Sequence, residues 1–120
     1  MSLNIKRFEE ATAYVAPNHF DVCGLRLQGM EAQGSEKLWV GVSHFLPGGG
    51  AGPDAGALEK VYVVLDGCVT LRIDDQEYRL ERYDSVTIPA NMVRAIKNES
   101  NQVATMLVAM PSPSTLPDRT

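Results

Sequence analysis

The chain is poor in cysteine, in basic charge and in long apolar runs. Its 120 residues include two cysteines, Cys23 and Cys68, and because the N-terminal segment lacks the features of a secretory signal, both are expected to be free thiols. Eleven lysines and arginines against fifteen aspartates and glutamates give a formal net charge of -4, which argues against a nucleic-acid partner. No stretch reaches the roughly 18 apolar residues of a membrane span. We therefore expect a cytoplasmic protein that binds neither nucleic acid nor a membrane.

Stretches that favour helix are also scarce. Short β-branched runs separated by Gly, Pro, Asn and Asp dominate the sequence, and this pattern indicates an all-β protein. A chain of this length makes one domain. About eight evenly spaced strands predict a jelly roll or barrel over residues 20–110, with an N-terminal segment at 1–19 and a flexible Pro- and Ser-rich tail at 111–120. The glycine-rich residues 48–57 are predicted to form a loop, and residues 69–80 a hairpin.

Two stretches have the spacing of known motifs. Residues 47–67 (PGGGAGPDAGALEKVYVVLDG) follow the frame G-x5-H-x-H-x3-E-x6-G, and residues 82–98 (RYDSVTIPANMVRAIKN) follow G-x5-P-x-G-x2-H-x3-N. The glycines at both ends of the first motif are present, as are Pro89 and Asn98 in the second. The chain therefore resembles a cupin, a small double-stranded β-helix barrel of the jelly-roll kind. The resemblance implies a barrel interior that holds the functional site, and a homodimer.

The chain departs from the motifs at the positions that ligate a metal in cupins. Where the family has His, His, Glu and His, this chain has Asp54, Gly56, Lys60 and Arg94. A divalent ion needs deprotonated donors; arginine has no lone pair to offer, and lysine would first have to lose its proton. We therefore predict neither a metal at the usual centre nor any other cofactor.

The substituted positions predict an anion-binding site. If Lys60 and Arg94 point inward like the ligands they replace, Arg94 can offer a fork of donors to a carboxylate or phosphate. Arg94 and burial would also lower the pKa of Lys60, which makes Lys60 a candidate general base or Schiff-base nucleophile. Strand alternation puts Tyr62 and Asn98 on the same inward faces, and with Asp54 and Arg94 they form the predicted ligand-binding set. The alternative is that Asp54 and Lys60 form a salt bridge that only fills the barrel.

The strand predicted at 37–47 (KLWVGVSHFLP) adds His44 as a second candidate catalytic residue. His44 shares a face with two valines and a leucine, and if that face lines the barrel, His44 lies in the site. The alternative is a hydrogen-bonded structural histidine. Trp39 and Phe45, on the opposite face, would then be part of the outer surface of a homodimer. His19 is expected to lie in solvent.

Three functions are compatible with the sequence. The first is a metal-independent barrel that binds a small anionic organic metabolite and acts on it through Lys60. The second is a binding or accessory module without catalysis. The third is a metal-dependent dioxygenase or isomerase whose ligands have moved to His44, Asp54 and Glu59. Whether the protein is an enzyme is left open.

Overall fold

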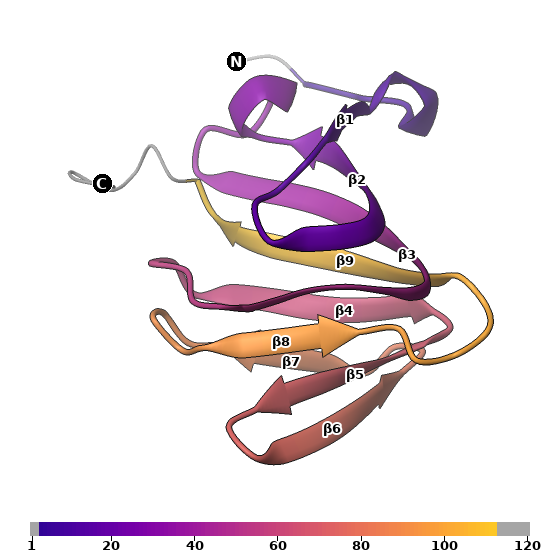
Figure 1. Ribbon diagram of the computed structural model, residues 1–120. Helices are drawn as coiled ribbons and strands as arrows, with labels where there is room; N and C mark the ends of the chain where they lie inside the picture. The colour runs from indigo at the N-terminus through magenta and orange to yellow at the C-terminus, as the bar shows by residue number, and fades with distance from the viewer. Residues whose placement is uncertain (1–2, 113–120) are drawn as a thin grey trace.

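The computed structural model describes residues 3–112 as a single nine-stranded sheet that curls into a barrel (Figure 1). All the strand pairs are antiparallel, which fits the predicted all-β jelly roll. In the described part of the chain no helix is long and apolar enough to cross a membrane. The elements are η1 (Phe8–Glu10), β1 (Thr12–Tyr14), β2 (His19–Gln28), η2 (Met30–Ala32), β3 (Leu38–Asp54), β4 (Lys60–Asp66), β5 (Cys68–Ile73), β6 (Gln76–Glu81), β7 (Ser85–Ile88), β8 (Arg94–Lys97) and β9 (Ala104–Pro111).

The long strand β3 holds the two sides of the barrel together. The strand order is β6-β5-β8-β3-β9-β4-β7, and β2 also pairs with β3 and carries β1 at its other edge. The first half of β3 pairs with β9, from Leu38 to Phe45, whereas its second half pairs with β8, from Gly50 to Asp54. This change of partner is what brings β4 and β8, the strands that carry Lys60 and Arg94, into one barrel.

The prediction of a glycine-rich loop is wrong for residues 48–54, which belong to β3. The glycines are needed because neighbouring backbones come very close there. A Cβ at Gly49 would clash with the carbonyl oxygen of Asp21, and one at Gly50 with the carbonyl oxygen of Ile96. A local preference for loop is therefore overridden by tertiary packing.

Alternate residues of the strands fill the barrel, as the pleat of a strand requires. The buried core cluster includes Trp39, Phe45, Tyr62, Val64, Val69, Leu71, Ile88, Ile96, Ala104 and Met106. The predicted hairpin is confirmed, because β5 and β6 pair from Cys68↔Glu81 to Ile73↔Gln76.

The predicted segment boundaries differ from the strands at both ends of the barrel. The segment predicted at 1–19 contributes β1, which pairs with β2 from Thr12↔Arg26 to Tyr14↔Gly24. At the other end β9 continues to Pro111, and Ser112 is buried. The rest of the predicted flexible tail lies outside the described residues.

Candidate functional site

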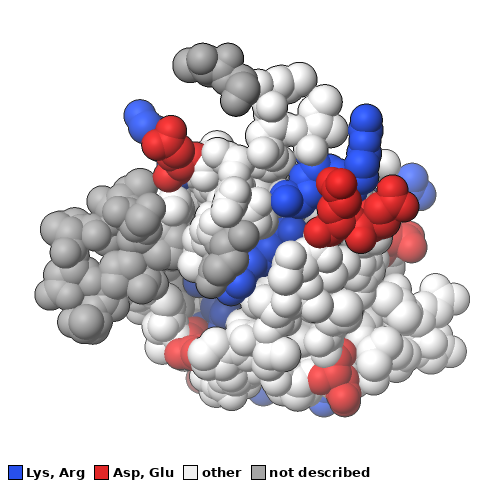
Figure 2. Space-filling model, turned by 90° about the horizontal axis from the view of Figure 1, so that it is seen from above, with Lys and Arg blue, Asp and Glu red and all other residues white. Residues whose placement is uncertain are grey.

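A cavity of about 170 Å³ lies inside the barrel, between side chains of β1, β2, β3, β4, β8 and β9. Much of its wall is apolar, from residues such as Trp39 and Met106. Its polar and charged lining residues are Tyr14, His19, Ser43, Lys60, Tyr62 and Arg94. From above the barrel, a band of Lys and Arg atoms crosses the middle of the face, with Asp and Glu atoms close to one end of it (Figure 2). The lining of the cavity therefore combines apolar side chains with basic and neutral polar ones, and among the described residues it includes no Asp or Glu.

Lys60, Tyr62 and Arg94 meet in this cavity, as strand alternation predicts. Tyr62 is 3% exposed and Arg94 is 9% exposed, while Lys60 is half-buried. The Nε of Arg94 donates a hydrogen bond to the hydroxyl oxygen of Tyr62 at 2.8 Å. The Nη1 of Arg94 is buried and has no hydrogen-bond partner in the described part of the chain. A buried donor without a partner costs about 1–3 kcal/mol, so the described residues leave this guanidinium incompletely hydrogen-bonded.

The amine of Lys60 lies in space that a side chain at position 56 would otherwise fill. A Cβ built on Gly56 would be 2.7 Å from Nζ, and Gly56 stands at one of the ligand-histidine positions of the first motif. Burial lowers the pKa of Lys60, Arg94 lowers it further, and Asp54 opposes the shift. This direction agrees with the one predicted from the sequence.

The salt bridge that would plug the barrel is not formed. Asp54 is exposed, and its Oδ1 accepts a hydrogen bond from the backbone N–H of Ala55 at 2.8 Å. Among the described residues Lys60 takes part in no ion pair. Asp54 therefore acts on Lys60 only through its charge, and it does not line the cavity.

Asn98 has a structural role that differs from the predicted ligand-binding one. It is fully buried, and its Nδ2 donates to the carbonyl oxygens of Phe45 and Gln102 at 3.0 and 2.7 Å. Its Oδ1 accepts from the backbone N–H and the hydroxyl of Ser100 at 3.0 and 2.7 Å. With both ends of its amide engaged, Asn98 holds the β8–β9 turn against β3 and does not line the cavity.

The predicted orientation of the strand that carries His44 is wrong. Trp39 and Phe45, 4% and 1% exposed, line the cavity, so they are not part of an outer dimer surface. His44 points the other way, and its ring contacts the ring of Phe8 at a centroid distance of 6.1 Å. His44 is therefore outside the site.

His19 is the site residue that the sequence reasoning missed. It opens β2 and lines the cavity, whereas a solvent-exposed position was expected. Its Nδ1 is 2.8 Å from the carbonyl oxygen of Pro17. Because a carbonyl can only accept, Nδ1 carries a proton, and the neutral ring has its lone pair on Nε2. The signal in the sequence was its place just after a Pro-Asn turn, where a strand begins.

Tyr14 and Ser43 complete the polar lining. Burial raises the pKa of Tyr14, while Arg26 and a hydrogen bond with Ser43 act in the opposite direction. The guanidinium of Arg26 also lies over the Tyr14 ring, 4.7 Å from its centroid. Tyr14 is thus a neutral hydroxyl near neutral pH, suited to hydrogen bonding with a ligand.

The donors that a metal would need are not gathered in the cavity. In residues 3–112, no three or more His, Cys, Asp or Glu side chains come together as a metal site. The alternative ligand set of His44, Asp54 and Glu59 is also not assembled, because His44 contacts Phe8 on the outside and the two carboxylates are exposed. His19 alone supplies a metal-type nitrogen to the lining.

The lowered pKa of Lys60 leads to a testable dependence of stability on pH. In the pH range between the pKa of Lys60 in the folded chain and its unfolded value of 10.5, the folded chain binds fewer protons than the unfolded chain. The free-energy cost of burying the charged amine is therefore fully present below the folded pKa and disappears as the pH rises toward the unfolded value. Lys60→Met should remove that penalty. We expect its stability advantage over the wild type, measured by urea unfolding, to be larger at about pH 7 than at about pH 10. Lys97→Met, at an exposed lysine, is the control, and a difference that does not vary with pH would contradict the prediction.

The curled sheet, with Lys60 and Arg94 of the two motifs lining the cavity, defines a small jelly-roll barrel. The Cupin domain family matches residues 41–110, and the chain belongs to that family. The fold expected from the motif frame is thereby confirmed.

Similar proteins are found both by sequence and by structure. The chain is 40% identical, over 92% of its length and 96% of the relative's, to "Beta-D-galactosidase Rv1717" of Mycobacterium tuberculosis. The polyketide cyclase RemF of Streptomyces resistomycificus superposes with a TM-score of 0.80 at 17% identity, covering 92% of this chain and 80% of that one. A RmlC-like cupin of Shewanella frigidimarina gives 0.74 at 13% identity, covering 96% and 97%. The two structures support the fold.

Proposed function

We propose that this cupin binds a small organic molecule with a carboxylate or phosphate group in its barrel, and that Arg94 holds the anionic group. The observation that carries the proposal is the buried Nη1 of Arg94, which has no hydrogen-bond partner in residues 3–112. A buried charge is normally paired, and among the described residues this guanidinium has only the hydroxyl of Tyr62 as its side-chain hydrogen-bond acceptor. An anionic oxygen at Nη1 would supply both the missing hydrogen bond and the missing charge.

Two further features of the cavity support an anionic ligand. The half-buried amine of Lys60 adds a second positive charge to the same lining, where Asp and Glu are absent. Gly52 gives the guanidinium room, since a Cβ there would be 3.1 Å from Nη1. The apolar wall with Trp39 and Tyr62 suits the body of a small organic molecule, because such sites combine apolar surface with a few placed polar groups.

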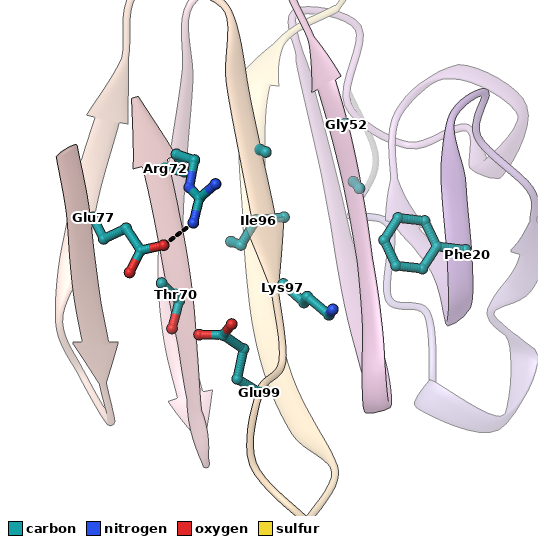
Figure 3. A pocket seen from close by; sticks show the side chains of 10 residues that line it. Phe20, Gly52, Thr70, Arg72, Glu77, Ile96, Lys97 and Glu99 are labelled. Atoms are coloured by element: carbon teal, nitrogen blue, oxygen red, sulfur yellow. Dashed lines mark hydrogen bonds and ion pairs between the residues drawn. The ribbon is translucent and has the colours of Figure 1, made fainter. Parts of the chain in front are cut away.

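A second candidate function is the hydrolysis of a β-D-galactoside. It is favoured by the 40% identity with the mycobacterial relative named as a β-D-galactosidase. Glycoside hydrolysis normally requires two carboxyl groups on either side of the scissile bond, and the barrel cavity has none in its lining. An outer groove over β5 and β8 does contain two, Glu77 and Glu99 (Figure 3). Glu77 is ion-paired there with Arg72.

Galacturonate and galactose, a matched acid and neutral sugar, separate the two candidates. Calorimetric titration should show that galacturonate binds at least about tenfold more tightly than galactose, because only the acid offers a charge to Arg94. Equal affinity for both sugars would contradict the anion site. Turnover of a chromogenic β-D-galactoside that is lost in Glu77→Gln and in Glu99→Gln, and kept in Arg94→Met, would favour galactoside hydrolysis in the outer groove.

We also propose that the chain forms a homodimer through the outer face of β2, β3, β9 and β4. One row across these strands, in register, consists of Leu25, Val42, Leu107 and Val63. Val42 is 5% exposed and the other three are partly exposed, and a continuous apolar row of this kind is typical of an interface. Leu107→Lys should yield monomers by light scattering coupled to gel filtration. Thr70→Lys, on β5, is the control and should leave the mass unchanged; a wild type that is itself monomeric would contradict the proposal.

A further inference from the structure

Lys60 is placed like a nucleophile rather than like a structural lysine. Its amine lies above the Cβ-less Gly56, and no described residue forms an ion pair with it. Lys60 opens β4, two residues before the buried Tyr62, which lines the same cavity. A lysine amine that is partly desolvated and beside another cation is activated because its neutral form is favoured.

Arg94 lines the same cavity as this amine, so a ligand bound by its guanidinium would be oriented relative to Lys60. Its Nε is fixed by the Tyr62 hydroxyl, so the guanidinium is held in one orientation, and no described residue forms a hydrogen bond with Nη1. Arg94 and Lys60 line the same cavity of about 170 Å³, so a carboxylate bound by the guanidinium would have its neighbouring carbon atoms in the same small space as the Lys60 amine. Holding two reacting groups together in this way is a large source of rate enhancement.

We propose that Lys60 forms a Schiff base with the carbonyl carbon of a small oxo acid whose carboxylate is bound by Arg94. The inference rests on the anion site proposed above and names its ligand class. The neutral Nζ attacks the carbonyl carbon, and the electron pair of the C=O bond moves to the oxygen. The resulting carbinolamine loses that oxygen as water while nitrogen shares its pair to form the C=N bond. No oxidant or further reactant is required.

The proton transfers of this step have candidate groups in the cavity lining. The attacking nitrogen must lose one proton and the departing oxygen must gain protons to leave as water. The Nε2 of His19 has a lone pair when Nδ1 donates to the Pro17 carbonyl, so His19 can accept a proton. The Tyr62 hydroxyl accepts from Arg94, which leaves its own hydrogen free to donate to the carbonyl oxygen.

Reductive trapping tests the proposal directly. The protein is incubated with glyoxylate or pyruvate and sodium cyanoborohydride, and the adduct is mapped by mass spectrometry of peptides. We expect one adduct per chain, on Lys60, and about tenfold less labelling by acetone, which has the carbonyl but no carboxylate for Arg94. Lys60→Arg should keep its fold by circular dichroism and lose the adduct, whereas Lys97→Arg should be labelled like the wild type.

The outcomes separate this proposal from the anion site on which it rests. Labelling that is spread equally over the lysines, or that persists in Lys60→Arg, overturns it. If either oxo acid raises the melting temperature in an Arg94-dependent manner without any Lys60 adduct, the Schiff base is wrong and the anion site stands. If the oxo acids neither stabilise nor label the protein and galacturonate does not bind either, both proposals fail.

Discussion

Replacing Asn98 by alanine should lower the free energy of unfolding by about 3–5 kcal/mol, the largest stability effect that we expect from one substitution. The fully buried amide serves β3 and the β8–β9 turn at once, through the carbonyls of Phe45 and Gln102 and through Ser100. Alanine would leave these backbone groups without partners and also create a cavity. Urea unfolding followed by fluorescence measures the change.

Two further variants show whether the amide itself is responsible. Asn101→Ala, at an exposed position in the same turn, should change stability by less than about 0.5 kcal/mol. Asn98→Asp keeps the size of the side chain but turns a donor into an acceptor facing the Phe45 and Gln102 carbonyls, so it should be nearly as damaging as alanine. If Asn98→Asp were as stable as the wild type, the hydrogen bonds would not be the cause.

The motif spacing and strand alternation together predicted that three side chains line one cavity. Lys60 and Tyr62 lie two residues apart on β4, and Arg94 lies on β8. Both strands are regular in this part, so the period of two places the side chains on one face. The two ends of each motif fix the register of these strands in the barrel. The inward position of all three side chains followed from the sequence for that reason.

The position of His44 could not be derived in the same way. Alternation divides β3 into two faces but does not say which one is inside, and both faces of this strand are apolar. The outer face carries Val42 in a row with Leu25 and Leu107, so hydrophobicity favours neither assignment. The aromatic side chains Trp39 and Phe45 fill the barrel because only that face meets the opposite wall.

The glycine-rich part of β3 and the role of Asn98 depend on tertiary contacts. Glycine at position 50 is explained by the Ile96 carbonyl, which lies far away in the sequence. Asn98 occupies a motif position, but whether its amide faces a ligand or the backbone is decided by the carbonyls of β3 that approach it. His19 was missed for a similar reason, since its strand pairs with Ala51 at the cavity wall. The local sequence marks where the strand of His19 begins, but it does not show which distant strands approach these residues.

The double variant Arg94→Met/Tyr62→Phe should abolish anion binding and leave the ligand-free protein at least as stable as the wild type. A buried charge that lacks a full set of partners costs free energy, and apolar replacement of such groups is often neutral or stabilising. The single variant Arg94→Met, by contrast, leaves the hydroxyl of Tyr62, 3% exposed, without its partner. That variant should lose about 1–3 kcal/mol, which the second substitution recovers. Urea unfolding of the two variants measures this difference.

Measurements of ligand binding distinguish an arginine that holds a ligand from one that only stabilises the fold. Loss of the guanidinium should weaken galacturonate or oxo acid binding by about 2–5 kcal/mol, or about 30-fold to several thousand-fold, in calorimetric titrations. Arg72→Met is the matched control, since Arg72 is exposed and ion-paired with Glu77 outside the barrel; it should leave affinity unchanged. An arginine retained for stability would show the reverse pattern, with a less stable double variant that still binds anions. Nη1 has no hydrogen-bond partner among the described residues, so the anion site that we propose predicts loss of binding without loss of stability in the double variant.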